Sequence, residues 1–239
     1  MSNSYLAHHF TWERYLTAAT HLSSRAFPST LLSDTPTLVS SPTSYPILLP
    51  GVDSLNHARG QPVSWVVNTP QASSSTAASE PSIALVLHTP SPAGHELFNN
   101  YGPKPNAELI LGYGFSLAQN PDDTIVLKIG GVPAAGHKWE VGRGASGAEP
   151  VWEAVKDAVR AQNNREGDDT VEEEDVEAAM SPEDELWATE VLMEMAEDLL
   201  GRLPPNSSAA SNGQEVRPEV AQMLDHYIEG MSLAASEVS

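Results

Sequence analysis

Three segments of the chain carry side chains that could do chemistry. Singly, each has an ordinary structural explanation: Arg25 could be a surface or helix-capping arginine, Asp53 and Asn56 could shape a turn, and Tyr101 could be a core tyrosine. A tyrosine hydroxyl can also orient an amine nucleophile, or accept its proton. The segments are Ser24–Phe27, Leu49–His57 and Glu96–Phe115.

The sequence lacks the residues that several other kinds of catalytic site require. The chain has no Cys, which excludes disulfides, thiolate nucleophiles and thiolate metal sites. Gly131–Lys138 resembles a phosphate loop only superficially, since His137 precedes Lys138 and no Ser or Thr follows. His8–His9 and His95–Glu96 lack a third ligand at sensible spacing, so no metal is predicted.

The three segments, in this order, resemble the SET-domain methyltransferases related to the Rubisco large-subunit lysine methyltransferase. That group has an Arg in Ser-Arg-x-Phe, then Asp-x-x-Asn-His, then Tyr-Gly-x-x-x-Asn-Ala-Glu-Leu ending in Tyr-Gly-Phe. The resemblance covers roughly Trp12 to Phe115. It implies an S-adenosylmethionine-dependent protein-lysine N-methyltransferase; methylation of a histidine side chain is a variant that this architecture can also support.

The resemblance also implies where S-adenosylmethionine binds. Asn56 and His57 match the family's Asn-His pair, which helps form the knot-like SET core and contacts the cofactor, an exception to the usual rule against threaded chains. Arg25 and Tyr101 match further positions at the cofactor. We therefore expect these four residues to bind S-adenosylmethionine.

The resemblance implies that the target lysine contacts Arg25, Asp53 and Tyr113. It also implies that Tyr101 is the catalytic tyrosine near the methyl-transfer axis. A methyl group on a sulfonium needs an in-line amine at near-attack distance and no metal. The lysine ammonium, with a reference pKa of about 10.4, must first lose its proton, which desolvation in a partly apolar channel favours. Full activity in a Tyr101→Phe variant would remove Tyr101 as the proton acceptor.

The first half of the chain predicts short strands and helices separated by irregular loops. Apolar residues recur at helical spacing from Trp12 to Leu22, with Thr11 as the N-cap. This pattern predicts an α+β fold and not a parallel doubly wound sheet. Strands are expected at Ser64–Asn68, Ile83–His88 and Asp123–Ile129, and a short helix at Asn106–Phe115 ended by Gly114.

The second half predicts helices. Val151–Gln162 is amphipathic, Ser181–Pro182 is a helix start for Glu183–Leu203, and Val216–Met231 is a further helix. We expect three parts: residues 1–130 as the C-terminal part of a SET domain with low-complexity loops at 33–44 and 71–82, residues 131–150 as a Gly-rich linker, and residues 151–239 as a helical, substrate-binding-like domain with an acidic linker at 166–177.

The charge of the chain limits the kinds of partner that it is expected to bind. A formal net charge of −20 argues against binding nucleic acid, whose affinity comes largely from Lys and Arg on phosphates. The stretch from Glu166 to Asp198 has no Lys or Arg, which favours a Lys-rich protein substrate such as a ribosomal protein or a histone. The alternative is that the acidic surface only keeps the protein soluble. No membrane association is expected, and we expect a monomer in the nucleus or cytoplasm.

One part of the family pattern is expected to be missing. SET proteins of this group begin with a Gly-containing strand that supplies part of the cofactor pocket, and nothing before Tyr5 matches it. We therefore expect the isolated chain to bind S-adenosylmethionine poorly. Two alternatives follow: a non-catalytic, SET-derived module that captures a basic protein partner, or a non-functional gene fragment.

Overall fold

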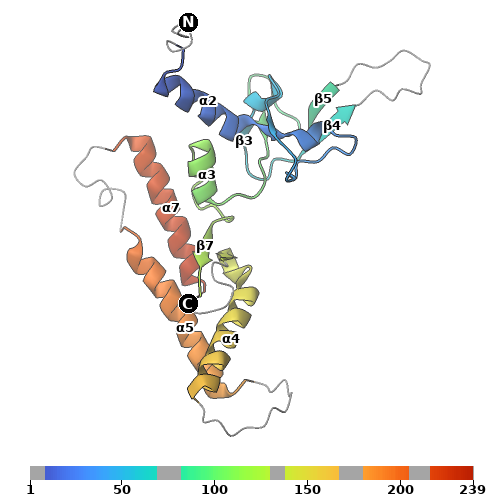
Figure 1. The fold of residues 1–239 in the computed structure, drawn as a ribbon. Helices are drawn as coiled ribbons and strands as arrows, with labels where there is room; N and C mark the ends of the chain where they lie inside the picture. The colour runs from blue at the N-terminus through green and yellow to red at the C-terminus, as the bar shows by residue number, and fades with distance from the viewer. Residues whose placement is uncertain (1–8, 69–81, 130–137, 167–179, 205–215, 239) are drawn as a thin grey trace, which may run out of the picture. The chain divides into compact units, whose positions relative to one another are not determined.

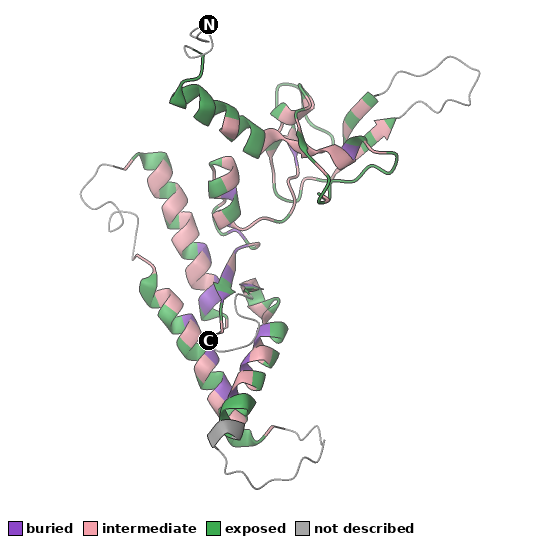
Figure 2. Ribbon diagram, viewed as in Figure 1, coloured by how far each residue is buried: buried purple, intermediate pink, exposed green. Residues whose placement is uncertain are grey.

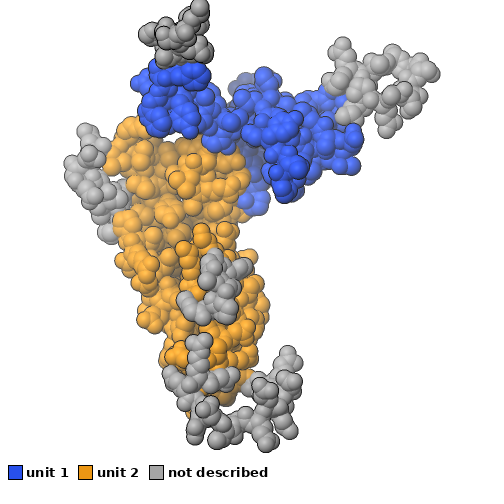
Figure 3. All heavy atoms as spheres, viewed as in Figure 1, with its two compact units in different colours: residues 1–103 blue, residues 104–239 orange. Residues whose placement is uncertain are grey.

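The computed structural model describes residues 9–68, 82–129, 138–166, 180–204 and 216–238, with the backbone alone at 164–166. The chain forms two compact units, Met1–Pro103 and Lys104–Ser239 (Figure 3). Both units combine helices with short antiparallel ladders, and the first also has a parallel one. This mixture confirms the predicted α+β class.

The first unit begins with helix α2, Trp12–Arg25 (Figure 1). Thr11 caps it as predicted, because its hydroxyl accepts a hydrogen bond from the Arg14 amide at 3.3 Å. The helix ends at Ala26, which has extended backbone. No residue of α2 is buried (Figure 2), and Trp12 is 69% exposed. The apolar residues from which the sequence predicts this helix are therefore exposed or only partly buried.

The described strands of the first unit pair in three two-stranded ladders. Proline interrupts two of the strands, which keeps their ladder short, since proline has no amide hydrogen to donate. Two short 3-10 turns, η1 (Ser29–Leu32) and η2 (Val52–Ser54), lie between them. The pairs are β1 (Phe27–Pro28) with β2 (Pro46–Ile47), antiparallel; β3 (Asn56–His57) with β6 (Phe98–Asn99), parallel; and β4 (Val63–Asn68) with β5 (Ser82–Leu87), antiparallel.

The β4–β5 hairpin confirms the two longer strands predicted in this half. Trp65 of β4 packs edge-on against Phe27, with 4.9 Å between ring centroids. The predicted low-complexity loop 71–82 lies outside the described residues except for Ser82, which begins β5. Leu31 and Asn99 are the fully buried residues that the structure describes in this unit, so its apolar core is small.

The second unit begins with helix α3, Asn106–Tyr113. Gly114 ends it in the left-handed conformation, φ 77°, and its amide donates to the carbonyls of Leu109 and Ile110. Glycine adopts that conformation without a steric penalty, which is why the sequence predicts the end of this helix correctly. Strand β7, Thr124–Leu127, then pairs antiparallel with β8, Trp139–Gly142.

Three long helices complete this unit: α4 (Ala148–Glu166), α5 (Pro182–Arg202) and α7 (Pro218–Ser236). Ser181 caps α5, since its hydroxyl accepts from the Asp184 amide, and Pro182 takes the first helical position as predicted. The helices pack against β7 and β8 around one apolar core (Figures 1 and 2). The buried members of this core are Ile125, Leu127, Val141, Val151, Val155, Val159, Ala188, Leu192, Ala234 and Ala235.

Strand β8 lies within the stretch predicted as a Gly-rich linker. It is only four residues long, and its Val141 is buried in the core, so packing and not local pattern decides its conformation. A short 3-10 turn, η3 (Arg143–Ala145), joins it to α4. The acidic linker predicted at 166–177 lies outside the described residues apart from Glu166, the last residue of α4.

A buried polar junction joins α3, β7 and α7. The Asp123 carboxylate accepts from the Asn106 amide at 2.6 Å and from the Asn106 side-chain amide at 3.0 Å. Gly230 of α7 approaches so closely that a Cβ added there would lie 1.9 Å from Oδ2 of Asp123. Burial raises the pKa of the Asp123 carboxyl, although the Asn106 hydrogen bonds and the charge of Arg143 oppose this shift.

Candidate functional site

The Arg25 guanidinium is the centre of a hydrogen-bonded network in the first unit. Its Nη1 lies within hydrogen-bond distance of the carbonyl oxygens of Asp53 and Leu55, at 3.2 and 3.1 Å, and of the Tyr101 hydroxyl, at 3.0 Å. Its Nη2 donates to Oδ1 of Asn56 at 2.8 Å. One side chain at the end of α2 thus joins residues from all three segments that the sequence singles out. We call these five residues the arginine network.

Tyr101 is fixed from several directions. Its hydroxyl donates to the Leu55 carbonyl at 2.7 Å, and its amide donates to Nδ1 of His57 at 3.0 Å. The His57 and Tyr101 rings stack with centroids 5.1 Å apart and planes at 29°. Because Nδ1 of His57 accepts this bond, a neutral His57 carries its proton on Nε2. Gly102 follows with φ 91°, a backbone conformation in which a side chain would be strained.

The parallel β3–β6 pair explains how distant segments meet. Asn56 pairs with Phe98 and His57 with Asn99, and the Ala58 amide extends the ladder by donating to the Asn99 carbonyl at 2.9 Å. Asn99 is 3% exposed, whereas its neighbour across the ladder, His57, is half-buried and Asn56 is exposed. The ladder holds the Asn-His pair next to the strand that leads into Tyr101.

Asp53 enters the arginine network through its backbone. It lies in η2, and its carbonyl oxygen accepts a hydrogen bond from the Arg25 guanidinium. The amide of Asp53 donates to the Leu49 carbonyl at 3.0 Å, which closes the turn before β3. Its predicted contact with the substrate therefore stays a prediction.

Glu96 belongs to the site, although the family resemblance assigns it no role there. Its Oε1 accepts a hydrogen bond of 2.7 Å from Nδ2 of Asn56. An exposed glutamate in a loop has no distinguishing pattern, and the two residues are far apart along the chain. Only its place just before β6 would have indicated this contact.

Tyr113 lies in the second unit, at the end of α3, so its predicted meeting with Arg25 and Asp53 stays a prediction. The Lys104 ammonium lies 5.5 Å from the Tyr113 ring centroid and forms an ion pair with Glu108. Burial lowers the pKa of Lys104, but its contacts with Glu108 and Tyr113 outweigh this effect and raise the pKa overall. Phe115 packs edge-on against Tyr113 at 6.2 Å.

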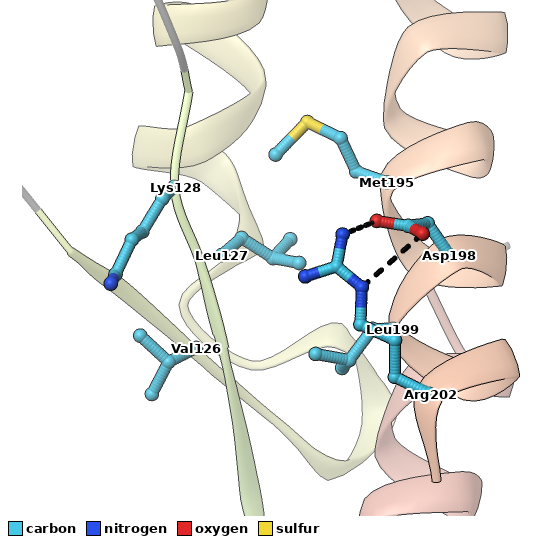
Figure 4. Close-up of a pocket in the computed structure, with 7 residues that line it drawn as sticks. All are labelled: Val126, Leu127, Lys128, Met195, Asp198, Leu199 and Arg202. Atoms are coloured by element: carbon cyan, nitrogen blue, oxygen red, sulfur yellow. Dashed lines mark hydrogen bonds and ion pairs between the residues drawn. The ribbon is translucent and has the colours of Figure 1, made fainter.

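A cavity of about 250 Å³ opens between β7 and α5 in the second unit (Figure 4). Its walls combine apolar side chains with the charged side chains of Lys128, Asp198 and Arg202, and Arg202 forms an ion pair with Asp198 one turn earlier on α5 (Figure 4). None of the predicted site residues lines it. The lining residues are Val126, Leu127, Lys128, Met195, Asp198, Leu199 and Arg202.

No three His, Asp or Glu side chains of the described ranges lie close enough together to hold a metal ion. No helix in the described part of the chain is long and apolar enough to cross a membrane.

About half of the chain is similar to known proteins. Over 129 residues it is 43% identical to ribosomal lysine N-methyltransferase set10 of Schizosaccharomyces pombe, a stretch that covers 54% of this chain and 21% of that protein. A second relative, also named a ribosomal lysine N-methyltransferase, is ribosomal lysine N-methyltransferase 1 of Saccharomyces cerevisiae. It is 34% identical over 106 residues, which cover 44% of this chain and 15% of the relative. No protein-family model matches the chain.

These names agree with the prediction of a protein-lysine methyltransferase and with lysine as the target. They do not favour the alternative of a non-catalytic binding module. The aligned part spans only 21% and 15% of the two relatives' lengths, so it represents a minor part of each.

Proposed function

We propose that this chain is part of an S-adenosylmethionine-dependent protein-lysine N-methyltransferase of the SET type, in the Rubisco large-subunit methyltransferase-like group. The arginine network carries this proposal. Arg25, Asn56 and Tyr101 come from three motifs that match the family in order, and hydrogen bonds of 2.8 and 3.0 Å from Arg25 join them. The similarity to two lysine N-methyltransferases adds support.

A threaded SET core is the finer part of this proposal. The parallel pairing of β3 with β6 supports it, because this ladder brings the Asn-His segment beside the strand that precedes Tyr101. We propose residues 1–130 as SET-derived, residues 131–150 as the connection, and α4, α5 and α7 within residues 151–239 as the substrate-binding domain.

Arg25, Asn56, His57 and Tyr101 would hold S-adenosylmethionine. Their chemistry fits its amino-acid part, since the exposed Asn56 carboxamide has a second N–H and a second oxygen lone pair beyond its bonds to Glu96 and Arg25, and Arg25 supplies positive charge. The cofactor supplies a methyl group on a positively charged sulfur. No metal is needed for the transfer, because the amine nucleophile requires only deprotonation and alignment.

In this proposal Tyr101 orients the target amine and does not remove its proton. The hydroxyl proton is directed at the Leu55 carbonyl, and the hydroxyl oxygen faces the Arg25 guanidinium. A neighbouring guanidinium disfavours added positive charge on that oxygen, so the hydroxyl is a poor base. It remains a good hydrogen-bond acceptor for a neutral amine, and Asp53 and Tyr113 would complete the lysine pocket.

A ribosomal protein rich in lysine is the proposed substrate. The names of both relatives support this class, and α5 presents an acidic surface that would attract basic residues. We propose a monomer in the nucleus or cytoplasm, where ribosomal proteins are made and assembled. The exposed acidic residues of α5 are Glu183, Glu185, Glu190, Glu194, Glu197 and Asp198.

A transfer assay tests this proposal. The full chain is incubated with labelled S-adenosylmethionine at millimolar concentration, so that weak binding does not hide transfer, and with ribosomal proteins produced in bacteria. We expect label on lysine side chains, identified by mass spectrometry, and a strong loss in the Arg25→Ala variant. Absence of both transfer and cofactor crosslinking would overturn the proposal, as would label on histidine alone.

A further inference from the structure

We propose that Glu96 is a positioning residue of this site, which holds the Asn56 carboxamide in the single orientation that presents its oxygen to Arg25. This inference rests on the proposed function for its consequence, weaker cofactor binding when Glu96 is lost. Its structural part, the fixed orientation of Asn56, can be tested separately.

The Asn56 carboxamide is held at both ends by charged groups of opposite sign. Its Oδ1 accepts from the Arg25 guanidinium at 2.8 Å, and its Nδ2 donates to the Glu96 carboxylate at 2.7 Å. A half-turn of the amide would place NH2 against the guanidinium and the oxygen against the carboxylate, and both contacts would become repulsive. Hydrogen bonds with one charged partner are the stronger kind, so the pair selects one orientation.

The register of the β3–β6 ladder explains how Glu96 reaches Asn56. Asn56 pairs with Phe98 in parallel, and residue 96 precedes residue 98 by one side-chain repeat. Glu96 and Phe98 therefore project to the same side of the extended chain, and the Glu96 carboxylate can extend to the amide on the neighbouring strand. Any sequence change that moves this register by one residue would separate them.

The rest of the arginine network does not depend on Glu96. The Arg25 guanidinium also contacts the carbonyls of Asp53 and Leu55 and the Tyr101 hydroxyl, so it stays in place when Glu96 is replaced. Asn56 and Glu96 are both exposed. Loss of the carboxylate should therefore free the Asn56 amide without unfolding the unit, and the effect should fall on ligand binding and not on stability.

Two substitutions separate positioning from charge. Glu96→Gln keeps a side-chain oxygen that can accept from Asn56, whereas Glu96→Ala removes the acceptor. Because solvent weakens this exposed hydrogen bond, we expect Glu96→Ala to raise the dissociation constant of S-adenosylmethionine about two- to tenfold. Glu96→Gln should stay within about twofold. Glu219→Ala, at an exposed glutamate of α7 outside the acidic surface of α5, is the matched control for loss of one negative charge.

The experiment combines calorimetry with S-adenosylmethionine, thermal unfolding, and nuclear magnetic resonance of the Asn56 side-chain amide in the full chain. An Asn56→Asp variant identifies the amide signals. We expect these signals to shift in Glu96→Ala, to stay near their original positions in Glu96→Gln, and the unfolding midpoint to be unchanged in both.

The outcomes distinguish the two proposals. Unchanged Asn56 signals in Glu96→Ala would overturn the positioning role, whether or not the chain binds cofactor. Equal weakening of binding by Glu96→Gln and Glu96→Ala would also overturn it, because the charge would then act on the ligand directly. A lowered unfolding midpoint in Glu96→Ala would reassign the residue to the fold. If the wild-type chain neither binds cofactor nor transfers methyl groups, the proposed function fails while the shifted Asn56 signals still support the positioning role.

Discussion

Replacing Gly230 with alanine would force a methyl group into a carboxylate that cannot easily move. The added Cβ would lie 1.9 Å from Oδ2, 2.5 Å from Cγ and 3.0 Å from Cβ of Asp123. Asp123 is 3% exposed and receives hydrogen bonds of 2.6 and 3.0 Å from Asn106. To accommodate alanine, Asp123 must leave these bonds or α7 must move away from the core.

The expected loss of stability follows from the hydrogen bonds that Asp123 would lose. Two hydrogen bonds to a carboxylate contribute about 1.5 to 3 kcal/mol each. Alanine in place of glycine stabilises a helix by about 1 kcal/mol, which offsets part of this loss. We therefore expect Gly230→Ala to lower the free energy of unfolding by about 2 to 5 kcal/mol, which is a large share of the stability of an ordinary domain.

Urea unfolding followed by circular dichroism of the helices measures this change in the full chain. Gly201→Ala in α5 is the matched control, because a Cβ there meets nothing within 4 Å. That variant should be unchanged or more stable by up to about 1 kcal/mol. Gly230→Ala combined with Asp123→Ala should be little less stable than Asp123→Ala alone, since the carboxylate is then absent. If Gly230→Ala were as stable as Gly201→Ala, the close packing of α7 on Asp123 would be refuted.

Three further predictions concern the site and the second unit. Tyr101→Phe removes the hydroxyl that contacts Leu55 and Arg25, and should slow methyl transfer to a ribosomal protein about tenfold to a hundredfold in single-turnover assays; an unchanged rate would contradict the orienting role. Burial raises the pKa of Asp123 above its ordinary value of 3.8, so the folded state binds more protons than the unfolded state between the two pKa values. The stability that Asp123 contributes should be largest below pH 3.8 and should fall as the pH rises through the raised pKa. The unfolding free energy of the wild type minus that of Asp123→Asn, measured against pH, checks this sign. An increase of this difference with pH would contradict the prediction. Ser181→Ala removes the cap of α5 and should cost about 1 kcal/mol, whereas Ser181→Asp keeps an acceptor and should cost little; equal unfolding midpoints for the two variants would argue against the cap.

The sequence by itself determined the features that depend on neighbours along the chain. Thr11, Ser181 and Gly114 set helix ends through hydrogen bonds that span three to five residues, so their positions are readable without the fold. The α+β class and the helical second half follow from the same local patterns. The three motifs likewise indicated a family, because their residues keep a fixed order.

The tertiary structure alone decided which distant groups meet. Nothing local to Glu96 or Gly230 predicts that one bonds to Asn56 and the other packs on Asp123. The burial of Val141 in β8, and the exposure of Trp12 on α2, also depend on what packs nearby and not on residue type. The physical reason is that an amphipathic pattern or a polar side chain states what a residue can do, while packing and register select the partner with which it does so.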